Sequence, residues 1–327
     1  MDERPLGTTG ASVTEVGLGT WELGGDWGDV DEERAREAIH AALDAGINFL
    51  DTADVYGDGR SERLIREVLA ERDEEPFVAT KAGRRLDPHT AERYTEANLR
   101  AFVEDSRDRL GVDSLDLVQL HCPPTDAYYR PATFDALAEF RDEGLIDHYG
   151  VSVERVEEAL KAIEYPGVET VQLIFNPFRQ RPRELFFEEA AARNVGVIVR
   201  VPLASGLLTG TLSADTEFPE NDHRNFNREG EAFDVGETFA GVPFERGLEA
   251  VDELESVVPE GQSTAQFTLR WILDHDAVTT VIPGSSSPEH IRDNVAAAAL
   301  PRHSADRHAR VREVYDEYVR EHVHQRW

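Results

Sequence analysis

The chain has 327 residues, of which 34 are basic and 65 are acidic, so its formal net charge at pH 7 is −31. Hydrophobic residues make up 40% of the chain, too many for a disordered protein, and we expect a folded protein with an acidic surface. Such a surface repels nucleic acids and anionic lipids, so neither nucleic acid nor a membrane is an expected partner.

Lysine occurs only at Lys81 and Lys161. With the strong negative charge, this composition resembles that of proteins from salt-in halophiles and predicts a halophilic, archaeal source. Cys122 is the only cysteine, so no intramolecular disulfide or cysteine-based zinc cluster can form, and we expect no metal site. The start of the chain has no apolar signal segment, and no apolar run reaches about 18 residues, so a cytoplasmic location is expected.

Short apolar runs alternate with longer segments of helical period, which is the pattern of βαβ units in a parallel sheet. We expect strands at residues 13–19, 47–51, 77–81, 115–121, 147–152, 170–174, 197–200 and 279–283. Helices are expected to follow them at residues 31–45, 60–72, 93–110, 133–143, 154–163, 184–193, 264–275 and 288–298. Eight strand–helix pairs predict an α/β fold, a closed (β/α)8 TIM barrel formed by residues 1–327 as a single domain.

Two segments extend beyond this repeat. Residues 204–262 contain a long loop and an extra helix expected at 246–258, after the seventh strand, and long loops in compact domains are usually functional. A further C-terminal helix is expected at 304–323. A Rossmann fold is disfavoured, because Gly-x-Gly-x-x-Gly should follow its first strand, where this chain has Gly-Leu-Gly-Thr-Trp at 17–21.

Ionisable residues end three consecutive strands of the predicted barrel. Asp51, Lys81 and His121 close the second, third and fourth strands, and catalytic groups of such barrels lie at the carboxyl ends of strands. Neighbouring strands lie ~4.8 Å apart, so these groups can share one site with Tyr56, from the loop after Asp51. Because a lysine cation favours phenolate, we expect Lys81 to lower the pKa of Tyr56 and make it a proton donor.

The other two residues complete a proton-transfer site that lacks only a hydride source. Asp51 could orient Lys81, and His121 could hydrogen-bond a substrate oxygen beside Tyr56. Without such a function, Asp51 would simply cap a loop, and His121 would be a strand-end residue whose imidazole is hydrogen-bonded within the protein. Lys81 is harder to explain structurally, because the chain has discarded nearly every other lysine and arginine would tune a pKa less well.

Three motifs carry these residues: Asn-Phe-Leu-Asp-Thr-Ala-Asp-Val-Tyr-Gly at 48–57, Ala-Thr-Lys at 79–81 and Val-Gln-Leu-His at 118–121. In order and strand position they resemble the catalytic tetrad of the aldo-keto reductases. Leu-Gly-Thr-Thr-Gly at 6–10, Gly-Leu-Leu-Thr-Gly at 206–210 and Ile-Pro-Gly-Ser at 282–285 extend the similarity over residues 5–298. The resemblance implies an oxidoreductase that transfers a hydride between NADP(H) or NAD(H) and a small aldehyde, ketone or aldose, with Tyr56 as general acid or base.

The loop after the eighth strand has the composition of an anion site. Gly-Ser-Ser-Ser-Pro at 284–288 precedes a predicted helix, with Ser287 as its N-cap and Pro288 at its first position, and helix N-termini attract phosphate. No Asp or Glu occurs at 190–214 or 277–288, which favours a binding site for a polyanionic cofactor. The alternatives are that 284–288 is a plain helix cap and that buried strands exclude charge from both stretches.

The resemblance also implies the residues that would hold the cofactor. They are Gly19, Thr20, Trp21, Ser152, Gln172, Arg200, Pro202, Leu203, Gly206, Leu208, Gly284, Ser285, Ser286, Ser287, His290, Asp293 and Asn294. Of these, Ser152 and Gln172 would meet the nicotinamide amide. Two positions depart from the family pattern: Val153 replaces a frequent asparagine, and Arg200 replaces an aromatic residue and could stack on nicotinamide. His290 and Arg292 favour NADP(H) over NAD(H).

The substrate is expected to be a small carbonyl compound or alcohol. Its pocket could be lined by aromatic residues from the loops, namely Trp21, Trp27, Tyr128, Tyr129, Phe226, Phe233 and Phe239, although each could equally be packing. Two other enzyme classes lack their signatures, since a metal-dependent hydrolase would want His-x-His on an early strand and a glycosidase two carboxylic acids at strand ends. A cofactor-binding, redox-sensing regulatory subunit stays open, as does the choice between monomer and homo-oligomer.

Overall fold

The computed structural model describes residues 1–327 except residues 26 and 29. Its main sheet is parallel throughout and runs in chain order from one edge strand to the other. The strands are β3 (Leu18–Gly19), β4 (Phe49–Asp51), β5 (Phe77–Ala82), β6 (Leu115–His121), β7 (Ile146–Ser152), β8 (Thr170–Ile174), β9 (Gly196–Arg200) and β10 (Thr280–Val281). Parallel bridges between Val16 and Val281 and between Gly19 and Gly284 join the two edges, and the predicted (β/α)8 barrel is confirmed.

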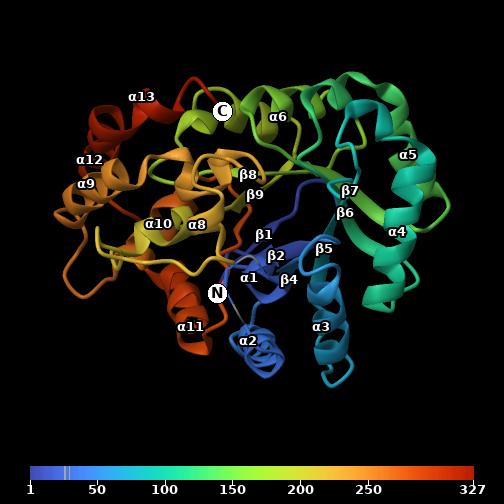
Figure 1. Ribbon diagram of the computed structural model, residues 1–327, viewed down its shortest axis with the longest axis horizontal. Helices are drawn as coiled ribbons and strands as arrows, with labels where there is room; N and C mark the ends of the chain where they lie inside the picture. Colours follow the sequence, from blue (N-terminus) through green and yellow to red (C-terminus); the bar gives the residue numbers. More distant parts are fainter. Residues whose placement is uncertain (26, 29) are drawn as a thin grey trace.

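Helices surround this sheet (Figure 1). One of them follows each strand from β3 to β10, and the bounds are α2 (Glu32–Asp44), α3 (Arg60–Leu69), α4 (Glu96–Leu110), α5 (Pro131–Asp142), α6 (Val156–Ala162), α7 (Phe186–Ala192), α10 (Thr264–Leu273) and α11 (Pro288–Ala296). Polar caps fix several of their starts: the side chains of Asp31, Thr95 and Ser287 accept amide hydrogen bonds at α2, α4 and α11, and Ser263 forms a capping box with Gln266 at α10.

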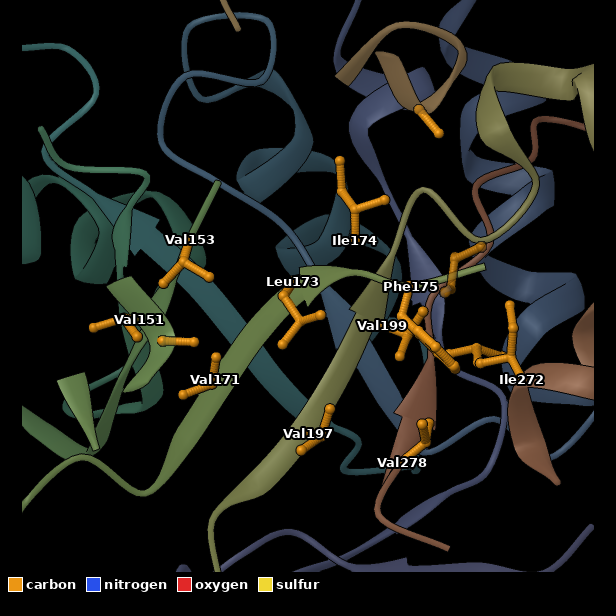
Figure 2. Packing of buried hydrophobic residues seen from close by; sticks show 14 of the residues in the cluster. Val151, Val153, Val171, Leu173, Ile174, Phe175, Val197, Val199, Ile272 and Val278 are labelled. Atoms are coloured by element: carbon orange, nitrogen blue, oxygen red, sulfur yellow. The ribbon is translucent and has the colours of Figure 1, made fainter. Parts of the chain in front are cut away.

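The alternation of side chains along the strands builds two hydrophobic layers. Leu117 and Ile198 belong to a small inner cluster that fills the barrel, whereas Val197 and Val199 face the helices. Figure 2 shows the second layer, to which neighbouring strands contribute Val151, Val171, Leu173, Val197 and Val199 and α10 contributes Ile272. Because side chains alternate with a period of two, the residues two positions beyond the inner layer point into the barrel mouth.

The predicted first strand was wrong over its first half. Residues 12–14 form β2 (Ser12–Thr14), which pairs antiparallel with β1 (Glu3–Pro5), whereas Leu18–Gly19 pairs with β4 and Val16 forms an isolated bridge to Val281. The hairpin closes the barrel floor with Leu6 and Val13, both fully buried in the inner cluster. The turn signal Gly-Thr-Thr-Gly at 7–10 separates its strands.

The two segments outside the repeat also form helices. The one expected at 246–258 is α9 (Phe244–Glu255), and the C-terminal one is divided into α12 (Ala305–Val314) and α13 (Arg320–Val323) by a π-helical turn. The short helices α1 (Trp21–Gly24) and α8 (His223–Phe226) were not predicted. Among the described residues, no helix combines the length and the apolar composition needed to cross a membrane.

Candidate active site

Four of the predicted site residues meet at the carboxyl ends of β4, β5 and β6. Asp51 and Lys81 each lie two residues beyond an inner-layer residue, Phe49 and Ala79, and therefore point into the barrel mouth. Lys81 is buried, and its ammonium donates to Asp51 Oδ1 at 2.5 Å and to the carbonyl oxygen of Thr52 at 2.9 Å. Its third partner is the hydroxyl of Tyr56, at 3.3 Å.

Tyr56 and His121 face each other at the top of this cluster. Their ring centroids are 6.0 Å apart in an edge-on arrangement, and Nδ1 of His121 is buried without a hydrogen-bond partner among the described residues. Gly24 lets α1 approach Tyr56, since a Cβ there would lie 2.6 Å from the Cβ of Tyr56. Trp21, on the same helix, stacks beside the Tyr56 ring with the centroids 6.2 Å apart.

Burial and charge set the protonation of these groups. Burial raises the pKa of Tyr56 and outweighs the opposing effect of Lys81, so the predicted net lowering was wrong although Lys81 does act in the expected direction. Burial alone would lower the pKa of Lys81, but Asp51 and Tyr56 reverse this and raise it. Burial, followed by the cations Arg84 and Lys81, holds the pKa of His121 well below its usual value, which leaves a neutral imidazole.

A cavity of about 520 Å³ opens beside Asp51, Tyr56 and His121. Lys81 lies behind Tyr56, outside its lining. Most residues that the family resemblance assigns to the cofactor line this cavity: Gly19, Thr20, Trp21, Gln172, Arg200, Pro202, Leu203, Gly206, Gly284, Ser285, Ser286, Ser287, His290, Asp293 and Asn294. They come from the ends of β3, β8, β9 and β10 and from α11, so one groove joins the tetrad to the predicted anion loop.

Some residues that were expected to contact the cofactor lie outside the cavity or have other partners. Ser152 and Leu208 are fully buried outside the lining, because Ser152 faces the Cys122 sulfur at 3.6 Å and Leu208 packs into the core. Gln172 reaches the cavity, but its side-chain amide donates to Asp51 Oδ2 at 2.6 Å and is therefore committed to the tetrad. Val153 is buried in the core, and its carbonyl oxygen accepts from Arg200 at 3.1 Å.

Arg200 is held by carboxylates from two other loops. Its Nη2 donates to Glu154 Oε2 at 2.9 Å, and Nη1 lies 3.8 Å from Glu237, which also binds Arg84 at 2.8 Å. Burial raises the pKa of Glu154, while Arg84 and Arg200 overcome burial and lower that of Glu237. The sequence analysis missed Arg84, Glu154 and Glu237. Glu154 and Arg84 each follow a strand end closely, a position that could have suggested them.

The aromatic wall is smaller than predicted. Trp21 and Trp27 line the cavity and lie edge to face, with their centroids 5.6 Å apart, and Phe233 and His223 pack against Trp21. The other expected aromatics lie elsewhere. Tyr128 and Phe239 are in the hydrophobic core, Tyr129 is 63% exposed, and Phe226 contacts the edge of Phe233.

The chain is similar to known proteins over most of its length. The model of the aldo/keto reductase family matches residues 15–316. An uncharacterized oxidoreductase, YqkF, of Bacillus subtilis is 30% identical over 92% of each chain. The NADH-specific methylglyoxal reductase of Escherichia coli is 29% identical, over 94% of this chain and 96% of that enzyme.

Among solved structures, the glycerol dehydrogenase AKR11B4 of Gluconobacter oxydans superposes with a TM-score of 0.78 at 29% identity, over 97% of this chain and 96% of that one. The relatives of this chain include proteins from bacteria, fungi and a plant, and they give no support to the archaeal, halophilic source expected from the composition.

Proposed function

The chain belongs to the aldo/keto reductase family, and we propose that its tetrad interconverts a small aldehyde, ketone or aldose and the corresponding alcohol, using NADP(H) or NAD(H). The observation that carries this proposal is the buried chain of contacts from Asp51 through Lys81 to Tyr56, which ends on a phenol that lines the cavity. A phenol in such a place can donate a proton to a carbonyl oxygen and take it back from an alcohol.

Each tetrad residue has a distinct task in this proposal. Tyr56 transfers the proton, and the Lys81 ammonium stabilises the phenolate that remains. Asp51 keeps Lys81 charged and fixes its position. The neutral His121, which lines the cavity, hydrogen-bonds the substrate oxygen beside Tyr56.

The cavity has the size and the polar groups for a nicotinamide dinucleotide. Its volume lies within the usual range of cofactor sites. Its lining includes Arg200, whose Nε is buried without a hydrogen-bond partner among the described residues, and residues 284–287 before α11. When bound, the cofactor supplies or accepts the hydride. Of the basic residues expected to favour NADP(H), His290 lines the cavity and Arg292 does not.

Two further parts of the proposal concern the setting of the enzyme. Residues 1–327 would act as one catalytic unit, and the cytoplasm is its proposed location. The composition would adapt the surface to concentrated salt. At the substrate end, Trp21 and Trp27 would contact the apolar part of the carbonyl compound.

The test combines binding with turnover. Fluorescence titration with NADH and NADPH should give saturable binding of at least one of them. The bound reduced dinucleotide should then be oxidised when at least one member of a panel of small aldehydes, ketones and aldoses is added. Binding without turnover would favour a redox-sensing subunit, and no binding of either dinucleotide would contradict the proposed function.

Tyr56→Phe tests the proton donor. We expect it to lower kcat/KM for carbonyl reduction by about 10²–10⁴-fold, because the general acid is removed, while the Kd of the cofactor stays unchanged. Tyr129→Phe is the matched control, since it removes an exposed phenol and should keep full activity. A fully active Tyr56→Phe enzyme would exclude the assignment.

A further inference from the structure

A carboxylate occupies the loop that the sequence marks as an anion site. Oε1 of Glu22 accepts a hydrogen bond from the amide of Ser286 at 3.1 Å and another from its hydroxyl at 2.6 Å. Ser286 is buried and lies just before α11, whose N-cap is Ser287. Glu22 therefore holds donors that a phosphate would use at this helix N-terminus.

This contact connects parts of the chain that are distant in sequence. Glu22 comes from α1, after the first barrel strand, and enters a loop that has no acidic residue of its own from 277 to 288. Both Glu22 and Ser286 line the cavity. The charge at this end of the groove is therefore set by a residue that the composition of the loop does not reveal.

Among the described residues, the cation that contacts Ser286 binds its carbonyl oxygen and not its two donors. Arg34 of α2 lines the cavity and donates through Nε to the carbonyl oxygen of Ser286 at 3.1 Å, but its side chain is exposed and screened by solvent. Gly284 offers no side chain, and His290 is exposed. Glu22 is already bonded to the donors, so its charge should dominate the choice of ligand there.

We propose that Glu22 is a specificity-determining residue that makes the chain prefer NAD(H) to NADP(H). This inference rests on the proposed function, because it places the adenosine ribose beside Ser286. A 2′-hydroxyl can donate to the Glu22 carboxylate, as acidic residues do for NAD in other folds. A 2′-phosphate would have to displace that carboxylate from Ser286 and would face its negative charge.

The test measures the two dissociation constants separately from turnover. Fluorescence titration of the wild type should give a Kd for NADH at least about tenfold below that for NADPH, since juxtaposed like charges cost several kcal/mol and 1.4 kcal/mol is tenfold. Glu22→Gln keeps the shape of the side chain and an acceptor oxygen but removes the charge. It should reduce the ratio of the Kd for NADPH to the Kd for NADH by about tenfold, mainly by lowering the Kd for NADPH. Glu22→Ala should act in the same direction.

Fragments show whether the effect lies at the ribose. Adenosine 2′,5′-bisphosphate and adenosine 5′-monophosphate should compete with NADH, and Glu22→Gln should improve only the bisphosphate. Glu289→Gln is the matched control, because it removes the same charge from the exposed first turn of α11 outside the cavity. An equal gain in that variant would mean a general charge effect and overturn the role of Glu22.

The outcomes separate the two proposals. If both dinucleotides bind and Glu22→Gln leaves their ratio unchanged, the inference fails and the proposed function stands. A wild type that prefers NADPH would also overturn it, because the carboxylate would then move away from Ser286 at little cost. If neither dinucleotide binds, the proposed function itself fails.

Discussion

At the scale of single residues, the central feature is a buried ammonium whose donors are all used. Lys81 has three N–H groups, and its three partners are a carboxylate, a carbonyl oxygen and the Tyr56 hydroxyl. Arginine could not fill this position, because its planar group carries five donors and needs more room. The lysine-poor composition is therefore compatible with a site in which lysine is retained for its compact charge.

Replacing Lys81 by methionine should change both the rate and the pH profile of carbonyl reduction. Tyr56 acts as an acid, so the reaction requires the phenol and falls when the pH exceeds its raised pKa. Without the ammonium, the pKa of Tyr56 should rise further, which moves the alkaline limb of kcat/KM to higher pH. The rate should also fall by about 100-fold or more, because the phenolate product loses its cation.

The chain provides a matched control at its only other lysine. Lys161 lies on α6 and pairs with Glu164 at the surface, so Lys161→Met should keep the wild-type rate and profile. A Lys81→Met enzyme that is slow but has the wild-type alkaline limb would show that Lys81 has a structural role and does not tune Tyr56.

The positions of site residues were more predictable than their environment. Asp51, Lys81 and His121 could be found because apolar runs end at them, and a period of two aligns them. The direction of the net pKa shift of Tyr56 could not be predicted in this way, because it depends on the burial of Tyr56 by α1 and neighbouring elements. The carboxylate of Glu22 was equally hidden, since 264 positions separate it from Ser286.

At the scale of elements, the carboxylate of Glu237 ties the loop at 204–262 to the barrel mouth. Glu237 binds Arg84 after β5 at 2.8 Å and lies 3.8 Å from Arg200 at the end of β9. Its carbonyl oxygen accepts from Ser205 at 3.1 Å, at the start of the same loop. Because Glu237 and Arg200 line the cavity, this ion-pair cluster also forms part of the site wall.

Glu237→Gln should loosen this loop. Removing one partner of a buried ion pair leaves Arg84 and Arg200 less well compensated, at a cost of about 3 kcal/mol if the loop does not rearrange. We expect faster proteolytic cleavage within 204–262, located by mass spectrometry, and faster release of the cofactor. Glu217→Gln changes an exposed carboxylate of the same loop and should leave both rates unchanged. Equal cleavage of the two variants would argue against this anchoring role.

Helices were easier to locate than the first strand. Their starts carry side-chain caps, such as Ser263 with Gln266, that are visible as local sequence signals. The hairpin of β1 and β2 was missed because the pattern at residues 13–19 predicts one strand, although Ser12–Thr14 and Leu18–Gly19 belong to different sheets. Which sheet a strand joins depends on contacts that a local pattern does not contain.

At the scale of the whole molecule, a closed barrel carries an excess of 31 negative charges. Eight repeats of strand and helix were sufficient to predict this architecture, because few folds satisfy that order. Arginines at the surface form ion pairs with some of the carboxylates, as Arg36 does with Glu67 and Glu71. Most of the remaining acidic groups repel one another, which opposes the compact state.

This repulsion predicts that the stability of the chain rises steeply with salt. Raising KCl from about 0.1 M to about 2 M shortens the screening length from ~10 Å to below ~3 Å, which removes most interactions between exposed charges. A gain of several kcal/mol in a domain of this size should raise Tm by about 5 °C, measured by circular dichroism. Sorbitol at matched osmolality should give a smaller rise, because it does not screen charge. If KCl and sorbitol stabilise the chain equally, charge repulsion is not what limits its stability, and the acidic composition needs an explanation other than adaptation to salt.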